Sequence, residues 1–237
     1  MMGIYTITKR EFKAYFLSPL AYVYLITFLV IVNWLFFRGL FVMGETEVRS
    51  MFGLMPWIFL FFVPAVAMGK WAEERKMGTL EILFTLPIKD RDIVFAKFLA
   101  SLGLIIVAIL FTTPIPLTVS LLGQLDWGPV IGGYVGLILL GASYLSICLF
   151  LSSITESQII AFILGVVISF GMFIIGTPII STGSGILGNF LQYFGLGWHF
   201  DSIARGVIDS ADIIYYITVI TFFLMLNLKA LETKARK

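Results

Sequence analysis

Long apolar runs decide what this chain can fold into. The chain has 237 residues, of which 59% are hydrophobic and 13% are charged, and its mean hydropathy is +1.02. A soluble domain carries about 25% charged residues. Several runs are long enough to cross the hydrocarbon core of a bilayer as helices, which takes about 20 residues. Because a backbone surrounded by lipid must form its hydrogen bonds internally, helices are the expected structure. The sequence therefore predicts an all-α polytopic membrane protein.

Six transmembrane helices are predicted, separated by polar or glycine-rich segments. Their expected bounds are residues 19–41, 52–68, 93–122, 129–151, 159–180 and 213–228. The third run is longer than a straight helix across the hydrocarbon core needs, so we expect it to protrude or to bend at Pro114 and Pro116. Pro64 predicts a kink in the second.

Residues 3–17 precede the first span and are predicted to form an amphipathic interfacial helix. Aromatic and aliphatic residues gather on one arc of its helical wheel and basic residues on the opposite arc, which is typical of a helix lying in the headgroup plane. The apolar arc holds Ile4, Tyr5, Phe12, Tyr15 and Phe16, and the basic arc holds Lys9, Arg10 and Lys13. The alternative is a basic flank that only sets the topology.

The segment 181–212 is too long for a turn and rich in glycine, yet it is still apolar. It predicts two short re-entrant helices that dip into the outer leaflet and are broken at residues 195–197. Tyr193 and Trp198 are expected at the membrane–water interface, where such residues are enriched.

The distribution of Lys and Arg predicts the orientation. Thirteen lie before the first span, in the 70–97 region or after the last span, whereas only Arg38, Arg49 and Arg205 fall on the other side. By the positive-inside rule, both termini and the loop 70–91 face the cytoplasm, while residues 44–50 and 181–212 face outward. The predicted location is the cytoplasmic membrane.

The loop 70–91 is the only long polar interruption between spans, and it has a helical pattern of its own. Met77, Leu80 and Phe84 lie on one side, with Leu83 adjacent, which is the spacing of an amphipathic helix. Gly78 interrupts the charged lead-in, Thr79 can cap the helix that follows, and Pro87 ends that helix. The pattern predicts a short helix that docks into another component.

The same loop carries a resemblance to a known family. Residues 73–87 read Glu-Glu-Arg-Lys-x-Gly-Thr-Leu-Glu-x-Leu-x-x-x-Pro, which resembles the first cytoplasmic loop of ABC-2 type transporter permeases. The segment 199–209, together with Ser-Pro-Leu-Ala-Tyr at 18–22 after a basic N-terminus, is similar to the branch that contains the gliding-motility permease subunit.

The resemblance implies that the loop holds a coupling helix seated in a groove of a separate ATPase subunit. The coupling residues it implies are Glu73, Glu74, Gly78, Thr79, Leu80, Glu81, Leu83, Phe84 and Pro87. It also implies a dimer of two six-span chains, or a pair with a close relative, served by two ATPase subunits that bind the ATP and Mg²⁺. Export is the direction that the family suggests. A periplasmic-domain subunit is a further implied partner, and nucleic acid is not. The sequence does not reveal the substrate.

No catalytic, cofactor or metal site is predicted in the chain itself. It has no Gly-x-x-x-x-Gly-Lys-Ser/Thr phosphate-binding loop, and its single His and single Cys lie on different segments, which disfavours metal binding. Cys148 sits in an apolar run and is expected to be an inert core thiol. No charged residue falls near the middle of a predicted span, which argues against an ion-coupled pump.

Two alternatives to a transporter subunit stay open at this point. One is a mechanical or assembly role, in which ATPase cycling moves the spans and drives a periplasmic partner without transport. The other is an intramembrane serine protease using Ser184 and His199, which no other residue supports.

Two smaller patterns are interpreted as structural. Gly132 and Gly136 are expected to pack within one subunit rather than to form a dimer seam, and Asp201 and Arg205 are expected to pair along one helix.

Overall fold

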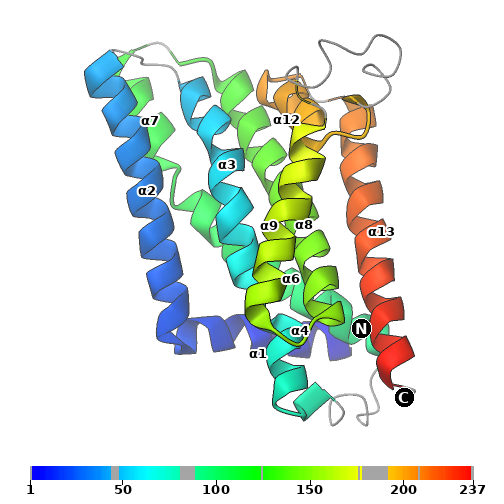
Figure 1. The fold of residues 1–237 in the computed structure, drawn as a ribbon. Coiled ribbons are helices and arrows are strands. Elements are labelled where there is room, and N and C mark those ends of the chain that lie inside the picture. Colours follow the sequence, from blue (N-terminus) through cyan, green and yellow to red (C-terminus); the bar gives the residue numbers. More distant parts are fainter. Residues whose placement is uncertain are drawn as a thin grey trace.

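The computed structural model describes residues 2–43, 48–80, 89–123, 125–175, 177, 192–207 and 209–235. Within these ranges every regular element is a helix (Figure 1). The helices are α1 (Met2–Leu17), α2 (Pro19–Met43), α3 (Val48–Ala67), α4 (Gly69–Lys76), α6 (Asp90–Leu110), α7 (Pro114–Leu122), α8 (Trp127–Ile154), α9 (Gln158–Ile174), α12 (Leu196–Ala204) and α13 (Ser210–Ala235).

Five helical stretches in the described residues are long and apolar enough to cross a membrane. They are Pro19–Gly39, Val48–Lys76, Asp90–Leu122, Trp127–Ile154 and Ser210–Thr233. The remaining predicted span, 159–180, corresponds to the shorter apolar helix α9 of 17 residues, and most of its predicted C-terminal part lies outside the described residues. The all-α membrane architecture is therefore confirmed, with five helices of spanning length and a sixth that is shorter.

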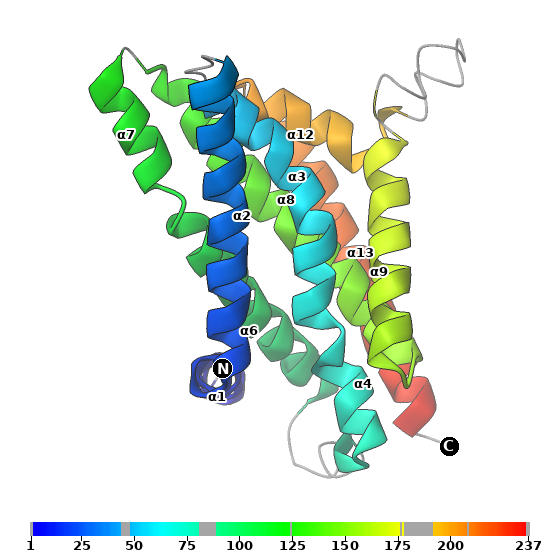
Figure 2. The ribbon, with the colours of Figure 1, turned by 60° about the vertical axis from the view of Figure 1, so that its left-hand side comes forward.

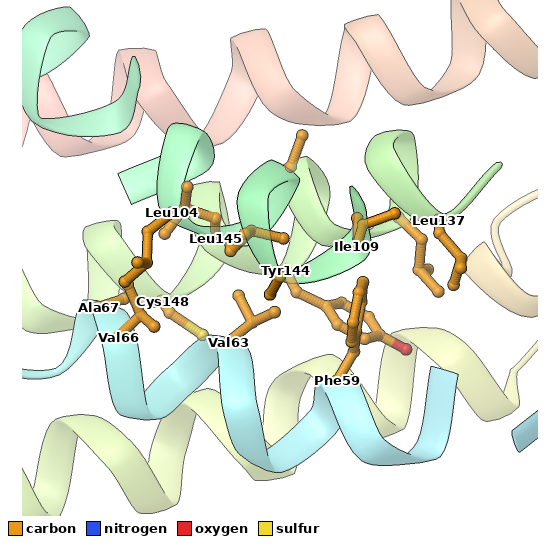
Figure 3. Packing of buried hydrophobic residues seen from close by; sticks show 14 of the residues in the cluster. Phe59, Val63, Val66, Ala67, Leu104, Ile109, Leu137, Tyr144, Leu145 and Cys148 are labelled. Atoms are coloured by element: carbon orange, nitrogen blue, oxygen red, sulfur yellow. The ribbon is translucent and has the colours of Figure 1, made fainter. Parts of the chain in front are cut away.

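Helix α8 is the centre of the bundle. Of the residues in its spanning part, 78% are buried, against 28% for α2 and 22% for α13, and it contacts α3, α4, α6, α9, α12 and α13. Phe59 and Val63 of α3 and Leu104 and Ile109 of α6 pack on its Tyr144, Leu145 and Cys148 face (Figure 3). Cys148 is a free, buried thiol, as expected.

Small residues let α12 approach α8 closely. A Cβ at Gly132 would lie 2.4 Å from the carbonyl oxygen of Ile203, and one at Gly136 would lie 3.3 Å from the ring of Phe200. Both contacts are within one chain, so the structure places this glycine pair in intrachain packing, as the sequence indicated.

The bend expected near Pro114 is present. Helix α6 ends at Leu110, a turn occupies residues 111–113, and α7 begins at Pro114. The carbonyl of Ile109 at the helix end accepts from the Thr112 hydroxyl at 2.7 Å and from the Thr112 backbone N–H at 3.0 Å. Helix α3 runs through Pro64 to Ala67, and the chain turns at Met68; the kink at Pro64 stays a prediction.

Helix α1 lies across one end of the bundle, nearly perpendicular to α2 (Figure 1). It packs on α6: Ile7 is buried, and the Tyr15 hydroxyl lies 2.8 Å from Ser101 Oγ. The three basic residues of its predicted polar arc are exposed. Tyr5 departs from the expected apolar face, since it is 69% exposed and faces the Lys9 ammonium.

The two ends of the bundle differ. Helices α1 and α4, the start of α6 and the end of α13 meet at one end, called here the α1/α4 end, and both chain termini lie there; α12 covers the opposite end (Figures 1 and 2). Helix α12 begins within the break predicted at 195–197, and Leu196, Phe200 and Ile203 are buried. The predicted first re-entrant helix lies almost wholly outside the described residues.

Candidate functional site around helix α4

Helix α4 is short, polar and held at the α1/α4 end by other parts of the chain. Its sequence is Gly-Lys-Trp-Ala-Glu-Glu-Arg-Lys, and Trp71 and Ala72 are completely buried. It contacts α3, α8 and α9 and projects beyond the apolar bundle (Figure 2). A helix of eight residues is marginal by itself in water, so its bonds to neighbouring helices decide its position.

Ser152, near the end of α8, fixes the start of α4. Its hydroxyl donates to the carbonyl of Met68 at 2.8 Å. The same oxygen accepts hydrogen bonds from the backbone N–H groups of Trp71 at 3.2 Å and Ala72 at 3.3 Å. The first N–H groups of a helix have no partner within it, and here one serine on another helix satisfies two of them.

Arg75 binds the turn that joins α8 to α9. Its guanidinium donates to the carbonyl of Thr155 at 3.2 Å and to the carbonyl of Ser153. Carbonyls at a helix C-terminus lack intrahelical donors and carry partial negative charge, so a cation there is favourable. The guanidinium of Arg75 therefore attaches the end of α4 to the end of α8.

Lys97 of α6 makes the second ionic attachment. Its ammonium donates to Glu74 and to the carbonyl of Lys70 at 3.1 Å, and it lies 4.7 Å from the centre of the Trp71 ring. The side chain is only 2% exposed. A buried charge is tolerated when it is paired and hydrogen-bonded, and α4 supplies both partners.

Two further contacts complete the set. Lys70 lies 3.7 Å from Glu11 of α1 and 3.7 Å from the centre of the Tyr15 ring, while Glu73 accepts a hydrogen bond from Gln158 at the start of α9. Burial raises the pKa of Tyr15, so its phenol stays neutral beside Ser101. Helix α4 is thus bonded to α1, α6, α8 and α9.

The structure places five of the nine predicted coupling residues. Glu73 and Glu74 make the intrachain bonds just described. Gly78 has a backbone φ of +68°, in the left-handed region that glycine adopts without strain, and so forms the turn after α4. The Thr79 hydroxyl donates back to the carbonyl of Glu74 at 3.2 Å, and Leu80 is 8% exposed. The other four, Glu81, Leu83, Phe84 and Pro87, lie outside the described residues.

Sequence reasoning missed the residues that hold this site together. Arg75 stands inside the motif but was not among the predicted coupling residues. Ser152 is one serine at the end of an apolar span, and no sequence pattern distinguishes it. Lys97 lies near the start of the predicted span 93–122, but its burial and its bond to Glu74 depend on where α4 packs.

A second polar cluster lies at the opposite end, between α12 and α13. His199 Nδ1 is 2.6 Å from Asp212 Oδ1, His199 Nε2 is 3.2 Å from the carbonyl of Tyr193, and the imidazole stacks on Tyr215 at 3.9 Å. Both ring nitrogens therefore face acceptors. Ser184, the other half of the protease alternative, lies outside the described residues.

Asp201 and Arg205 of α12 contact each other differently from the predicted side-chain pair. Arg205 Nε donates to the backbone carbonyl of Asp201 at 3.0 Å. Burial raises the pKa of the Asp201 carboxyl, and the positive charge of Arg205 opposes the shift.

In the part of the chain that the structure describes, no group of three or more His, Cys, Asp or Glu side chains could hold a metal ion.

These features identify the class of the protein: it is a multi-pass membrane protein whose short polar helix α4 is bonded to four other helices. The family then follows from the sequence comparison. The model of the ABC-2 family transporter protein matches residues 6–226, so the chain belongs to the ABC-2 transporter family. No curated protein matches it.

Membership settles the general role. The chain is a membrane permease component of an ABC transporter, which is not catalytic by itself, and such components generally work in an assembly with an ATPase. The resemblance to the gliding-motility branch stays a prediction, because the family match does not distinguish branches.

Proposed function

We propose that this chain is the transmembrane subunit of an ATP-driven exporter and that residues 73–87 couple it to a separate ATPase subunit. The observation that carries the proposal is the set of bonds that holds α4. Through Arg75, Ser152, Glu74 and Glu73, the start of the loop is attached to α8, α6 and α9. A force applied to the loop would act on all three helices.

The packing of the bundle explains why such a force would be transmitted. Interiors packed at the density of organic crystals have low compressibility and transmit strain. Helix α8 is the most buried of the spanning helices and receives two of the attachments. A displacement of α4 would therefore shift α8 and the helices packed on it, instead of being absorbed in a flexible linker.

The proposed orientation puts the α1/α4 end in the cytoplasm. The basic residues of α1, α4 and the start of α6 meet at that end, which favours the cytoplasmic side of a cell membrane. The assembly we propose contains two permease chains, or this chain and a close relative, with two ATPase subunits that bind the ATP and Mg²⁺.

Cysteine labelling in intact cells tests this orientation. Glu47→Cys and Ser184→Cys are expected to react with a membrane-impermeant maleimide from outside, and Lys76→Cys only after the cells are opened. Cys148 is buried and serves as the unreactive internal reference. The reverse labelling pattern would contradict the proposed orientation.

A double substitution in the loop tests the coupling. Leu83→Ser with Phe84→Ser is expected to remove the apolar anchors of the docking helix, each worth more than about 1 kcal/mol at the centre of an interface. ATPase co-purification, or stimulation of ATP hydrolysis by the permease, is expected to be lost. Lys76→Ala changes an exposed residue of α4 and is expected to have a mild effect, because rim charges contribute little.

The double variant must remain monodisperse, with wild-type helix content, for this result to count. If it folds poorly yet still binds the ATPase normally when recovered, the two side chains only pack against their own chain. The coupling assignment would then be wrong.

A further inference from the structure

A cavity of about 390 Å³ lies in the corner where α1 turns into α2, against α3, α4 and α6. This is within the range of small-ligand pockets, about 300–1,000 Å³. Its lining has two distinct parts. Charged side chains come from α1, α4 and α6: Glu11, Lys70, Glu73, Glu74 and Lys97. Apolar side chains come mainly from α2 and α3: Leu20, Ala21, Ala65 and Val66.

The charged part of the cavity retains unused hydrogen-bonding capacity. Glu74 Oε2 is buried and has no hydrogen-bond partner among the described residues. Lys70 Nζ is 3.7 Å from Glu11 Oε2, longer than an ordinary hydrogen bond, and otherwise faces the Tyr15 ring. Buried polar groups are nearly always satisfied. The cavity thus presents both a donor and an acceptor to whatever fills it.

The charges select among the groups that could satisfy them. Three carboxylates and two lysines line the cavity, so an anion alone would meet net negative charge. A cation alone would leave Lys70 with no acceptor closer than Glu11, at 3.7 Å. A zwitterion with a primary ammonium satisfies both. A quaternary ammonium cannot donate hydrogen bonds and binds preferentially to aromatic faces, and the Tyr15 face is already taken by Lys70.

The apolar part indicates that the ligand comes from the bilayer. Leu20 and Ala21 lie in the first turn of α2, and Ala65 and Val66 lie near the end of α3. The cavity is therefore located where the apolar helices meet the polar α1/α4 end. Only 28% of the spanning part of α2 is buried, which leaves this helix largely available to acyl chains.

We propose that the cavity binds a phospholipid with a zwitterionic headgroup and a primary ammonium. A phosphate oxygen accepts from Lys70, the ammonium donates to Glu74 and Glu73, and the acyl chains leave along α2 and α3. The inference does not rest on the proposed coupling to an ATPase, because it concerns the isolated chain.

Lipid titration of the purified full chain in detergent micelles tests the site. Dioleoyl phosphatidylethanolamine, phosphatidylcholine and phosphatidylglycerol are compared by native mass spectrometry and by the shift in melting temperature. The ethanolamine lipid is expected to bind about tenfold more tightly than either of the others, the difference that a charge-assisted hydrogen bond supplies. Soluble phosphoethanolamine, which lacks the acyl chains, is expected to bind far more weakly.

Variants separate this site from general lipid contact. Glu73→Gln, which removes one acceptor of the ammonium, is expected to reduce the preference for ethanolamine lipid. Lys70→Gln removes the donor to the phosphate that all three lipids share and is expected to weaken their binding alike. Ala65→Leu keeps every charge and is expected to weaken binding by filling the cavity. Lys76→Gln removes a lysine of the same helix that does not line the cavity and is expected to bind like wild type. Equal binding of the three lipids, a preference for the anionic lipid, or equally tight binding of soluble phosphoethanolamine would overturn the proposal.

Discussion

Asp212→Ala is expected to lower the free energy of unfolding by about 1–3 kcal/mol, the usual cost of leaving a buried polar group without its partner. His199 and Asp212 are each 6% exposed. The imidazole lies between Asp212 and the carbonyl of Tyr193, and the substitution would leave one buried ring nitrogen without its partner. Denaturant titration of the purified chain in micelles, followed by tryptophan fluorescence, measures the loss.

Asp209→Ala provides a matched control at the start of the same helix. Asp209 accepts from the N–H of Ala211 at 3.1 Å as the N-cap of α13, and losing a cap costs about 1 kcal/mol. The pair His199→Phe with Asp212→Leu removes both polar side chains and is expected to recover much of the stability, because no buried polar group is then left without a partner. If Asp212→Ala costs no more than Asp209→Ala, the pair does not hold α12 to α13.

The second large effect is expected at the other end of the bundle. Glu74→Leu leaves the Lys97 ammonium, 2% exposed, with only the Lys70 carbonyl and the Trp71 ring, and is expected to cost about 3 kcal/mol or more. Because Glu74 is also one of the attachments of α4, ATPase stimulation by the variant is expected to fall as well. The two readouts are unfolding in micelles and ATP hydrolysis in the reconstituted complex.

Two variants serve as controls for Glu74→Leu: a substitution of the neighbouring carboxylate Glu73, and a double variant that removes both Glu74 and Lys97. Glu73→Gln changes an exposed residue that accepts from Gln158, and exposed polar contacts contribute about 0–1 kcal/mol. Lys97→Met with Glu74→Leu removes both charges and is expected to be more stable than Glu74→Leu alone. If the double variant is the less stable of the two, the buried charge is not the cause of the loss.

Much of the fold could be predicted because its signals are local. The predicted span 19–41 corresponds to Pro19–Met43, and 129–151 corresponds to Trp127–Ile154. The bend before Pro114 followed from the missing N–H of proline and from a run longer than the hydrocarbon core needs. The candidate loop also stood out locally, because it is a long polar interruption between two apolar runs.

The sequence by itself determined which segments are helices and where the candidate site starts, since hydropathy and proline act over a few residues. Only the tertiary structure decided what the charges of α4 do. Lys97 and Glu74 are 23 residues apart, and Gln158 and Glu73 are 85 apart. The packing of the apolar helices decides whether such a distant acid contacts a lysine, a partner protein or water. Burial of these helices contributes more free energy than any single ion pair, and it sets the positions of the polar residues at the helix ends.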